Sequence, residues 1–182
     1  MVYNAHDGRR SASRTRYFVS MLHWHIHRTY VPDGIYFVTT DVRYRIPIFA
    51  DTEIARIVGR SIWHERASRF VVYAYVIMPD HLHMLLRPTK ENISEIMRSI
   101  KTNSSREINR SLQHSRGHAT SAMEMFAWQQ SFYDHVITDD DDFRNHVEYI
   151  QYNPVRVGLC KTPEEYRFLF IDDKAMSKIL SL

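Results

Sequence analysis

A strand that carries two histidines is the feature that most constrains the fold of this chain. Residues 71–86 form an apolar, β-branched and aromatic run that Pro79-Asp80 interrupts, and this pattern predicts two strands joined by a tight turn. Side chains alternate between the faces of a strand, so His81 and His83 project from one face while the residue between them points into the core. Two imidazoles held in this way can bind one cation together.

A second segment, near the other end of the chain, predicts a helix with a tyrosine and an asparagine on one flank. The acidic run 139–142 can cap such a helix and complement its dipole. Tyr149 and Asn153 are four residues apart, so a phenol and an amide leave the helix together. Because the residue before a proline is pushed away from helical dihedral angles, we expect Asn153 to lie at the end of the helix. An apolar stripe at i, i+4 and i+7 supports the helix: Phe143, Val147 and Ile150.

The rest of the pattern predicts one α+β domain. The order β-α-β-β-α-β-α implies a small antiparallel-rich sheet with helices packed on it, of the ferredoxin-like kind. Asp51 is the expected N-cap of the first helix. The expected elements outside the two segments above are a strand at 35–40, helices at 52–65 and 92–112, and a strand at 132–137.

The bulk composition permits this fold and sets the expected compartment. A length of 182 residues with 44% hydrophobic residues suits one domain, and a net charge of +3 with a pI near 9.0 permits a polyanionic partner. The single cysteine, Cys160, excludes an internal disulfide, as expected in a reducing cytoplasm. No apolar run is long enough to cross a bilayer and the N-terminus has no signal-peptide core, so we expect a cytoplasmic protein.

Four motifs occur in order along the chain: residues 75–86, Trp128-Gln129, residues 132–137 and residues 149–159. Their order and spacing resemble those of the REP-associated tyrosine transposases, a branch of the HUH single-strand transposases, in which U is a bulky apolar residue. The resemblance runs from about residue 30 to Tyr166. It implies a basic N-terminal arm at 1–28, an HUH transposase domain at 29–160 and a C-terminal tail at 161–182. One departure lies in that tail, where many relatives carry a serine pair and this chain has Phe168-Leu169-Phe170.

The resemblance implies a metal-dependent single-stranded DNA endonuclease and strand transferase. In such an enzyme Tyr149 attacks the scissile phosphate and keeps the 5′ phosphate as a covalent ester, which conserves the bond for rejoining. His81, His83 and the amide oxygen of Asn153 would hold one divalent cation, for which Mn²⁺ matches the ligand set and Mg²⁺ is the abundant ion. The implied partner is a single-stranded DNA hairpin of the repeated extragenic palindrome type, bound by a nucleoid-associated monomer or homodimer.

Other interpretations of the same residues stay open. The chain could be a domesticated hairpin-binding protein without cleavage activity, although a pure binder need not keep all four site residues. A histidine-triad hydrolase also uses a His-x-His strand, but that motif requires a third histidine where Leu85 stands. The rival residues are His23, His25 and His27 as a metal site, Tyr152 as nucleophile, His146 for proton transfer, and Asp134 and Glu148 as extra metal ligands.

Two sets of side chains could contact DNA. On the helix expected at 92–112, three arginines lie opposite the apolar face with a lysine on the flank, a spacing that can follow a phosphate backbone or simply form a solvated face. Aromatic side chains could stack on unpaired bases, although strands bury aromatics routinely. The basic set is Arg98, Lys101, Arg106 and Arg110, and the aromatic set is Tyr36, Tyr44 and Tyr73.

Overall fold

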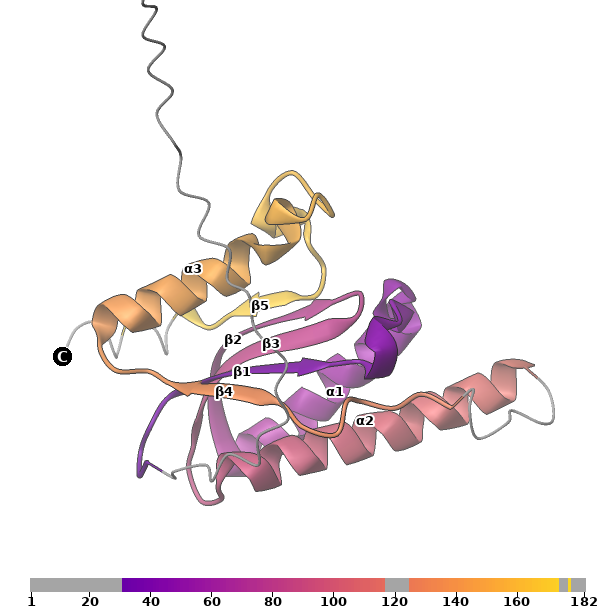
Figure 1. Ribbon diagram of the computed structural model, residues 1–182, viewed down its shortest axis with the longest axis horizontal. Coiled ribbons are helices and arrows are strands. Elements are labelled where there is room, and N and C mark those ends of the chain that lie inside the picture. Colours follow the sequence, from indigo (N-terminus) through magenta and orange to yellow (C-terminus); the bar gives the residue numbers. More distant parts are fainter. Residues whose placement is uncertain (1–30, 117–124, 174–176, 178–182) are drawn as a thin grey trace, which may run out of the picture.

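A five-stranded sheet is the central layer of the computed structural model, which describes residues 31–116, 125–173 and 177 (Figure 1). Neighbouring strands are antiparallel throughout, and their spatial order is β4-β1-β3-β2-β5. The expected basic arm at 1–28, with its three alternating histidines, lies outside the described residues. The strands are β1 (Tyr36–Asp41), β2 (Phe70–Met78), β3 (His81–Pro88), β4 (Tyr133–Val136) and β5 (Leu169–Ile171).

Helices cover both faces of the sheet. α1 and α2 pack against each other on one face, and α3 crosses the other face (Figure 1). The predicted α+β fold is confirmed, with the order β-α-β-β-α-β-α followed by one more strand. Along the described helices, none is both long and apolar enough to cross a membrane. The helices are α1 (Thr52–Arg69), α2 (Ile93–Arg116) and α3 (Asp140–Arg156), with short 3-10 turns η1 (Arg43–Arg45), η2 (Ile48–Ala50) and η3 (Pro163–Glu165).

Alternation along β3 separates two apolar cores, one on each face of the sheet. Leu82 and Met84 pack in the core beneath α1 and α2, whereas Leu85 packs in the core beneath α3. His81 and His83 alternate with Leu82 and Met84 and therefore face α3. A register slip of one residue would put the histidines into the larger core, and each buried leucine contributes roughly 1.5–3 kcal/mol to holding the observed register.

Aspartates begin α1 and α3, as the sequence predicts. The side chain of Asp51 accepts from the N–H groups of Glu53 and Ile54 at 2.8 and 3.3 Å. Asp139 accepts from the N–H of Asp142 at 2.8 Å. Each cap of this kind stabilises its helix by about 1 kcal/mol, so both helices start at a defined residue.

The end of α3 differs from expectation. The helix continues through Pro154 to Arg156, so the prediction that it ends at Asn153 is wrong. Pro154 removes one amide donor, but the last turn still closes because the N–H of Val157 donates to the carbonyl of Asn153 at 3.3 Å. Gly158, with φ +77°, then stops the helix in the left-handed conformation that glycine adopts without strain.

The sheet extends beyond residue 160, where we expected a tail to begin. β5 pairs with β2, and the N–H of Ile77 donates to the carbonyl of Phe168 at 3.0 Å. Phe170 stacks on Tyr75 and meets Trp63 edge-on. The aromatic segment that departs from the pattern of many relatives therefore forms an edge strand of the same sheet, held there by ring packing.

Candidate active site

Two imidazole nitrogens converge at the start of β3. The Nε2 atoms of His81 and His83 are 3.0 Å apart, and the rings meet at an interplanar angle of 79°. Leu82, between them, is buried in the opposite core, which shows the alternation expected from the sequence. Two unprotonated imidazole nitrogens this close to each other can share one cation.

A neighbouring oxygen holds the outer nitrogen of each ring. The Nδ1 of His81 donates to the carboxylate of Asp80, which in its ionised form can only accept. The Nδ1 of His83 lies 2.7 Å from Oγ1 of Thr39, the residue directly opposite it across the β1–β3 pair. Protons on both Nδ1 atoms leave both Nε2 lone pairs free, which is the usual orientation of metal-binding histidines.

The spacing of the histidine pair fits a divalent cation. Two bonds of about 2.1 Å that meet at about 90° separate their ligand atoms by about 3.0 Å. The two Nε2 atoms have this separation. The separation of the two nitrogens therefore matches the one that a shared divalent cation requires.

Burial keeps both rings neutral, the form that binds a metal. Burial holds the pKa of His83 well below its ordinary value, and the neighbouring His81 and the Arg45 guanidinium act in the same direction. Burial also lowers the pKa of His81, in spite of the opposing hydrogen bond to Asp80. Arg45 pairs with Asp41 and, from Nε, with Asp80 at 2.9 Å, so the carboxylate beside His81 is itself neutralised.

The covering helix places Tyr149 over the histidine pair. Its hydroxyl oxygen lies 3.5 Å from Nε2 of His83, and its ring meets His83 and Phe37 edge-on at centroid distances of 5.1 and 5.8 Å. Tyr149 is 38% exposed, so a ligand can reach it from solvent. The guanidinium of Arg156 lies 5.7 Å from the centroid of the same ring. The phenol oxygen thus lies beside the nitrogens that would hold a cation.

Asn153 and Tyr152 follow Tyr149 on α3 but occupy different sides of the helix. Asn153 is buried, and helix geometry sets it about 6 Å farther along the axis and about 40° around from Tyr149. Tyr152 is about 300° around from Tyr149 and is 40% exposed. Of these two helix tyrosines, Tyr149 is the one whose ring contacts His83.

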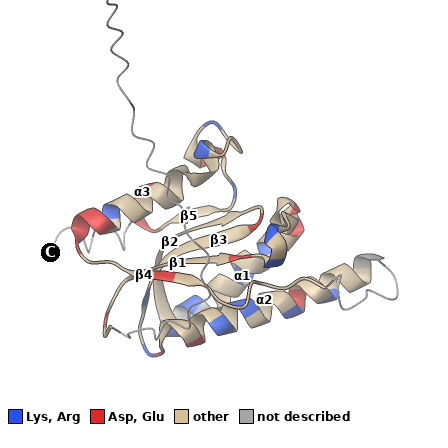
Figure 2. Ribbon diagram, in the orientation of Figure 1, with Lys and Arg blue, Asp and Glu red and all other residues tan. Residues whose placement is uncertain are grey.

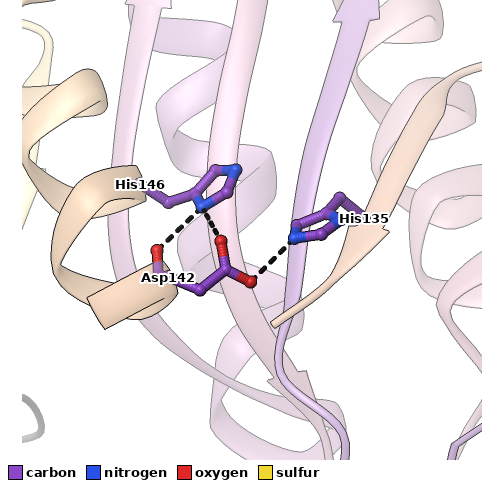
Figure 3. A group of neighbouring side chains, drawn as sticks. All are labelled: His135, Asp142 and His146. Carbon is purple, nitrogen blue, oxygen red and sulfur yellow. Dashed lines mark hydrogen bonds and ion pairs between the residues drawn. The ribbon is translucent and has the colours of Figure 1, made fainter. Parts of the chain in front are cut away.

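A second polar cluster lies between β4 and the first turns of α3 (Figure 3). The carboxylate of Asp142 is 2.8 Å from Nε2 of His135 and 2.9 Å from Nδ1 of His146, and it accepts from the N–H of Thr138 at 3.0 Å. Burial raises the pKa of Asp142, but the hydrogen bonds from Thr138 and His135 and the charges of both histidines outweigh it and lower the pKa overall. The cluster ties strand to helix, and its ligand atoms, all within 4.8 Å of one another, could also hold a metal.

Sequence patterns indicate only part of this cluster. Asp142 and His146 are four residues apart on a predicted helix, which is a visible signal. His135 joins them only because β4 pairs with β1 at the edge of the sheet. His146 packs on Phe37 at 4.6 Å, and Phe37 stacks on His83 at 5.5 Å. One aromatic ring therefore separates this cluster from the histidine pair.

The helix expected to contact DNA lies in the other layer of the fold. α2 packs on the face of the sheet opposite α3, and Figure 2 marks the positions of its lysines and arginines in blue along the ribbon. Arg98, Arg106 and Arg110 are exposed. Lys101 instead donates to the backbone carbonyls of residues 129–131. Its ammonium group therefore holds the segment before β4.

Other residues considered as ligands lie away from the histidine pair. Alternation along β4 puts Asp134 on the face opposite His135. Glu148 is exposed and approaches Arg156 at 3.9 Å. Leu85, at the next position of β3 on the face of the histidines, is buried beneath α3, which leaves no third imidazole there as a histidine-triad enzyme would require.

An antiparallel sheet with a His-x-His strand, covered by a helix whose tyrosine meets the second of those histidines, is the arrangement of an HUH-type single-strand nuclease. The sequence profile of the IS200-like transposases matches residues 31–153, and the chain belongs to this family. It is therefore a tyrosine transposase, and enzymes of this family depend on a metal.

Individual known proteins that resemble this chain are also tyrosine transposases. The chain is 27% identical over 145 residues to a proposed REP-associated tyrosine transposase of Haemophilus influenzae, with 78% of this chain and 81% of the relative covered. It is 28% identical over 143 residues to the REP-associated tyrosine transposase of Escherichia coli K12, with 78% of each chain covered. A solved REP-associated tyrosine transposase bound to a REP hairpin matches with a TM-score of 0.62 and 26% identity, over 84% of this chain and 85% of that one. The predicted resemblance to this group is confirmed.

Proposed function

We propose that this chain nicks and rejoins single-stranded DNA at hairpins, with Tyr149 as the nucleophile and a divalent cation held by His81, His83 and Asn153. One arrangement carries the proposal: the hydroxyl of Tyr149 lies 3.5 Å from a nitrogen that is itself 3.0 Å from its histidine partner. The solved relative bound to a REP hairpin supports a hairpin as substrate.

The reaction exchanges one phosphate ester for another. A bond forms between the phenol oxygen of Tyr149 and the scissile phosphorus, and the bond from phosphorus to the 3′ oxygen breaks. The phenol gives up a proton and the leaving 3′ oxygen takes one, so the products are a 5′-phosphotyrosine and a free 3′ hydroxyl. Because the number of ester bonds is unchanged, a 3′ hydroxyl can attack in reverse and rejoin the strand.

The chain's own residues prepare this exchange. A bound cation supplies the charge that polarises the phosphate. Asp80 fixes the tautomer and orientation of the His81 ring, and Thr39 holds the orientation of the His83 ring. The guanidinium of Arg156, 5.7 Å from the centroid of the Tyr149 ring, places a positive charge near a phenol that must give up its proton.

The ligand chemistry narrows the choice of cation. Two imidazoles and an amide oxygen match Mn²⁺ best, and Mg²⁺ is the abundant physiological candidate.

The nucleophile and the histidines meet within one chain, which supports action as a monomer, although a homodimer would also be compatible. We infer that this DNA-acting protein is associated with the nucleoid. α2 lies in the layer opposite α3, away from the proposed scissile site. The exposed side chains of Arg98, Arg106 and Arg110 would therefore contact phosphates of DNA that runs beyond that site.

A covalent-adduct assay tests the proposal. Labelled single-stranded hairpins are incubated with the protein and Mn²⁺ or Mg²⁺ and then denatured, and we expect a protein–DNA band that survives denaturation. Tyr149→Phe should abolish the band while hairpin binding stays, and Tyr152→Phe, the matched control one turn away, should leave it intact. Hairpin binding by the wild type without any adduct, or a nucleotide found on Tyr152 by mass spectrometry, would contradict the proposal.

A further inference from the structure

The turn that follows β1 has an unusual backbone. In η1, Tyr44 has φ +63° and Arg45 has φ +55°, so two consecutive non-glycine residues adopt the left-handed conformation. A side chain disfavours this region because its Cβ crowds the adjoining carbonyl. Such conformations persist where the surroundings enforce them, and they gather at functional sites.

The contacts of Arg45 account for its own strain. Its guanidinium bonds the carboxylates of Asp41 and Asp80, and Asp80 accepts from Nδ1 of His81. The left-handed backbone at Arg45 therefore brings a cation to the carboxylate that orients His81.

No packing of the side chain accounts for the strain at Tyr44. This residue is 82% exposed, more than any other large hydrophobic side chain in the described ranges. The guanidinium of Arg43 lies 5.4 Å from the centroid of its ring. The other two aromatics considered for base stacking, Tyr36 and Tyr73, are buried in the cores. Of these three, Tyr44 alone is available to a ligand.

The turn is fixed against the hairpin that leads into His81. The N–H of Val42 donates to the carbonyl of Asp80 at 2.8 Å, and the N–H of Phe49 donates to the carbonyl of Pro79 at 2.9 Å. Val42 and Phe49 are both buried, so both ends of the turn are anchored in the core. Figure 1 shows this dark purple segment beside the turn between β2 and β3. The backbone that carries the exposed ring is therefore fixed against the turn that leads into His81.

We propose that Tyr44 stacks on an unpaired base next to the scissile phosphate, with Arg43 contacting the adjoining phosphate. This subsite rests on the proposed function above. An exposed aromatic ring beside a guanidinium combines the two features that bind single-stranded nucleic acid in proteins, a π-face and a positive charge. Arg45 is engaged by two carboxylates, so Arg43 is the guanidinium that serves the ligand.

Binding of a labelled oligonucleotide tests the subsite. A hairpin with single-stranded flanks carries 2-aminopurine at one flank position at a time, and fluorescence is measured with the Tyr149→Phe protein, which forms no adduct. Tyr44→Ala should weaken binding about tenfold, the loss typical of one stacked base, and should remove the quenching of one flank position. Tyr44→Phe keeps the ring and should bind within about twofold of the parent. Trp63, 42% exposed on α1, is the matched control, because the Arg66 guanidinium lies 4.2 Å from the centroid of one of its rings on the other face of the sheet; Trp63→Ala should change neither quantity.

Tyr44→Gly separates stacking from backbone strain. Glycine adopts positive φ freely, so this variant should melt at or above the temperature of Tyr44→Ala and yet bind the flank as weakly. Unchanged affinity in Tyr44→Ala, or equal losses in Tyr44→Ala and Trp63→Ala, would overturn the subsite. The adduct assay and the binding assay can give different outcomes. A wild type that binds the flank through Tyr44 but forms no adduct contradicts the proposed reaction and supports the subsite. A parent protein that does not bind the hairpin contradicts both.

Discussion

Thr39→Val removes a single oxygen from beside the histidine pair. Oγ1 of Thr39 lies 2.7 Å from Nδ1 of His83, and His83 is only 5% exposed, so solvent cannot readily replace the lost partner. The ring then loses the contact that holds its orientation, so its Nε2 no longer faces the cation site in a fixed position. Loss of such an orienting partner typically lowers metal affinity 10–100-fold, or about 1.4–2.7 kcal/mol.

The next residue provides the control. Thr40 lies on the opposite face of β1, and its buried Oγ1 has no hydrogen-bond partner within the described ranges. Thr40→Val replaces an unsatisfied hydroxyl with a methyl group of the same shape, so it should stabilise the fold by about 1 kcal/mol and leave metal affinity unchanged.

Calorimetric titration with Mn²⁺ and chemical denaturation of both variants make the comparison. We expect weaker Mn²⁺ binding in Thr39→Val alone and a higher free energy of unfolding in Thr40→Val alone. Equal Mn²⁺ affinity in the two variants would show that Thr39 does not orient a metal-binding ring, and the reasoning from the 2.7 Å contact would fail.

Four further substitutions test the roles assigned to single side chains. His81→Ala should fold but lose nearly all adduct formation, whereas Asn153→Ala should weaken Mn²⁺ binding more mildly because water replaces an amide oxygen more easily than a fixed imidazole; equal effects in the adduct and titration assays would contradict this ranking. The lowered pKa of Asp142 means that its contribution to stability is present above its ordinary pKa of about 4 and is lost as the pH falls through the lowered value. Asp142→Asn should therefore flatten the acid limb of a pH–stability curve, and an unchanged limb would argue against the cluster. Burial raises the pKa of Tyr166 to about 12, and Cys160 acts in the same direction, so its contribution is complete below pH 10 or so and is lost as the pH rises through about 12. Tyr166→Phe, which removes a 2.9 Å hydrogen bond to the carbonyl of Ile77, should cost about 1 kcal/mol at neutral pH and flatten this alkaline limb in denaturant titrations; an alkaline limb as steep as that of the wild type would refute it.

Local periodicity determined the parts of the site that lie within one element. The two-residue period of a strand put His81 and His83 on one face, and the four-residue spacing on a helix put Tyr149 and Asn153 on one flank. The N-caps at Asp51 and Asp139 could also be predicted from the sequence, because a capping side chain bonds only the first turn of its own helix. Each of these inferences needs backbone geometry over a few residues and nothing more.

The tertiary structure decided what meets across elements. Thr39 faces His83 because the β1–β3 register pairs them, and that register depends on which leucines each core buries. The contact of Tyr149 with His83 joins residues 66 positions apart. His135 joins its cluster only through the pairing of β4 with β1.

Only the structure shows which aromatic side chains are exposed and where the backbone is strained. Sequence patterns rank Tyr36, Tyr44 and Tyr73 alike, since each is an aromatic near a strand, yet packing buries two of them and leaves Tyr44 in solvent on a left-handed backbone. The sequence pattern suggests that Lys101 is a solvated cation on a helix face, whereas in the structure its ammonium group donates to the segment before β4. Burial and pairing are properties of the assembled layers, and a local pattern carries no information about which layer will cover it.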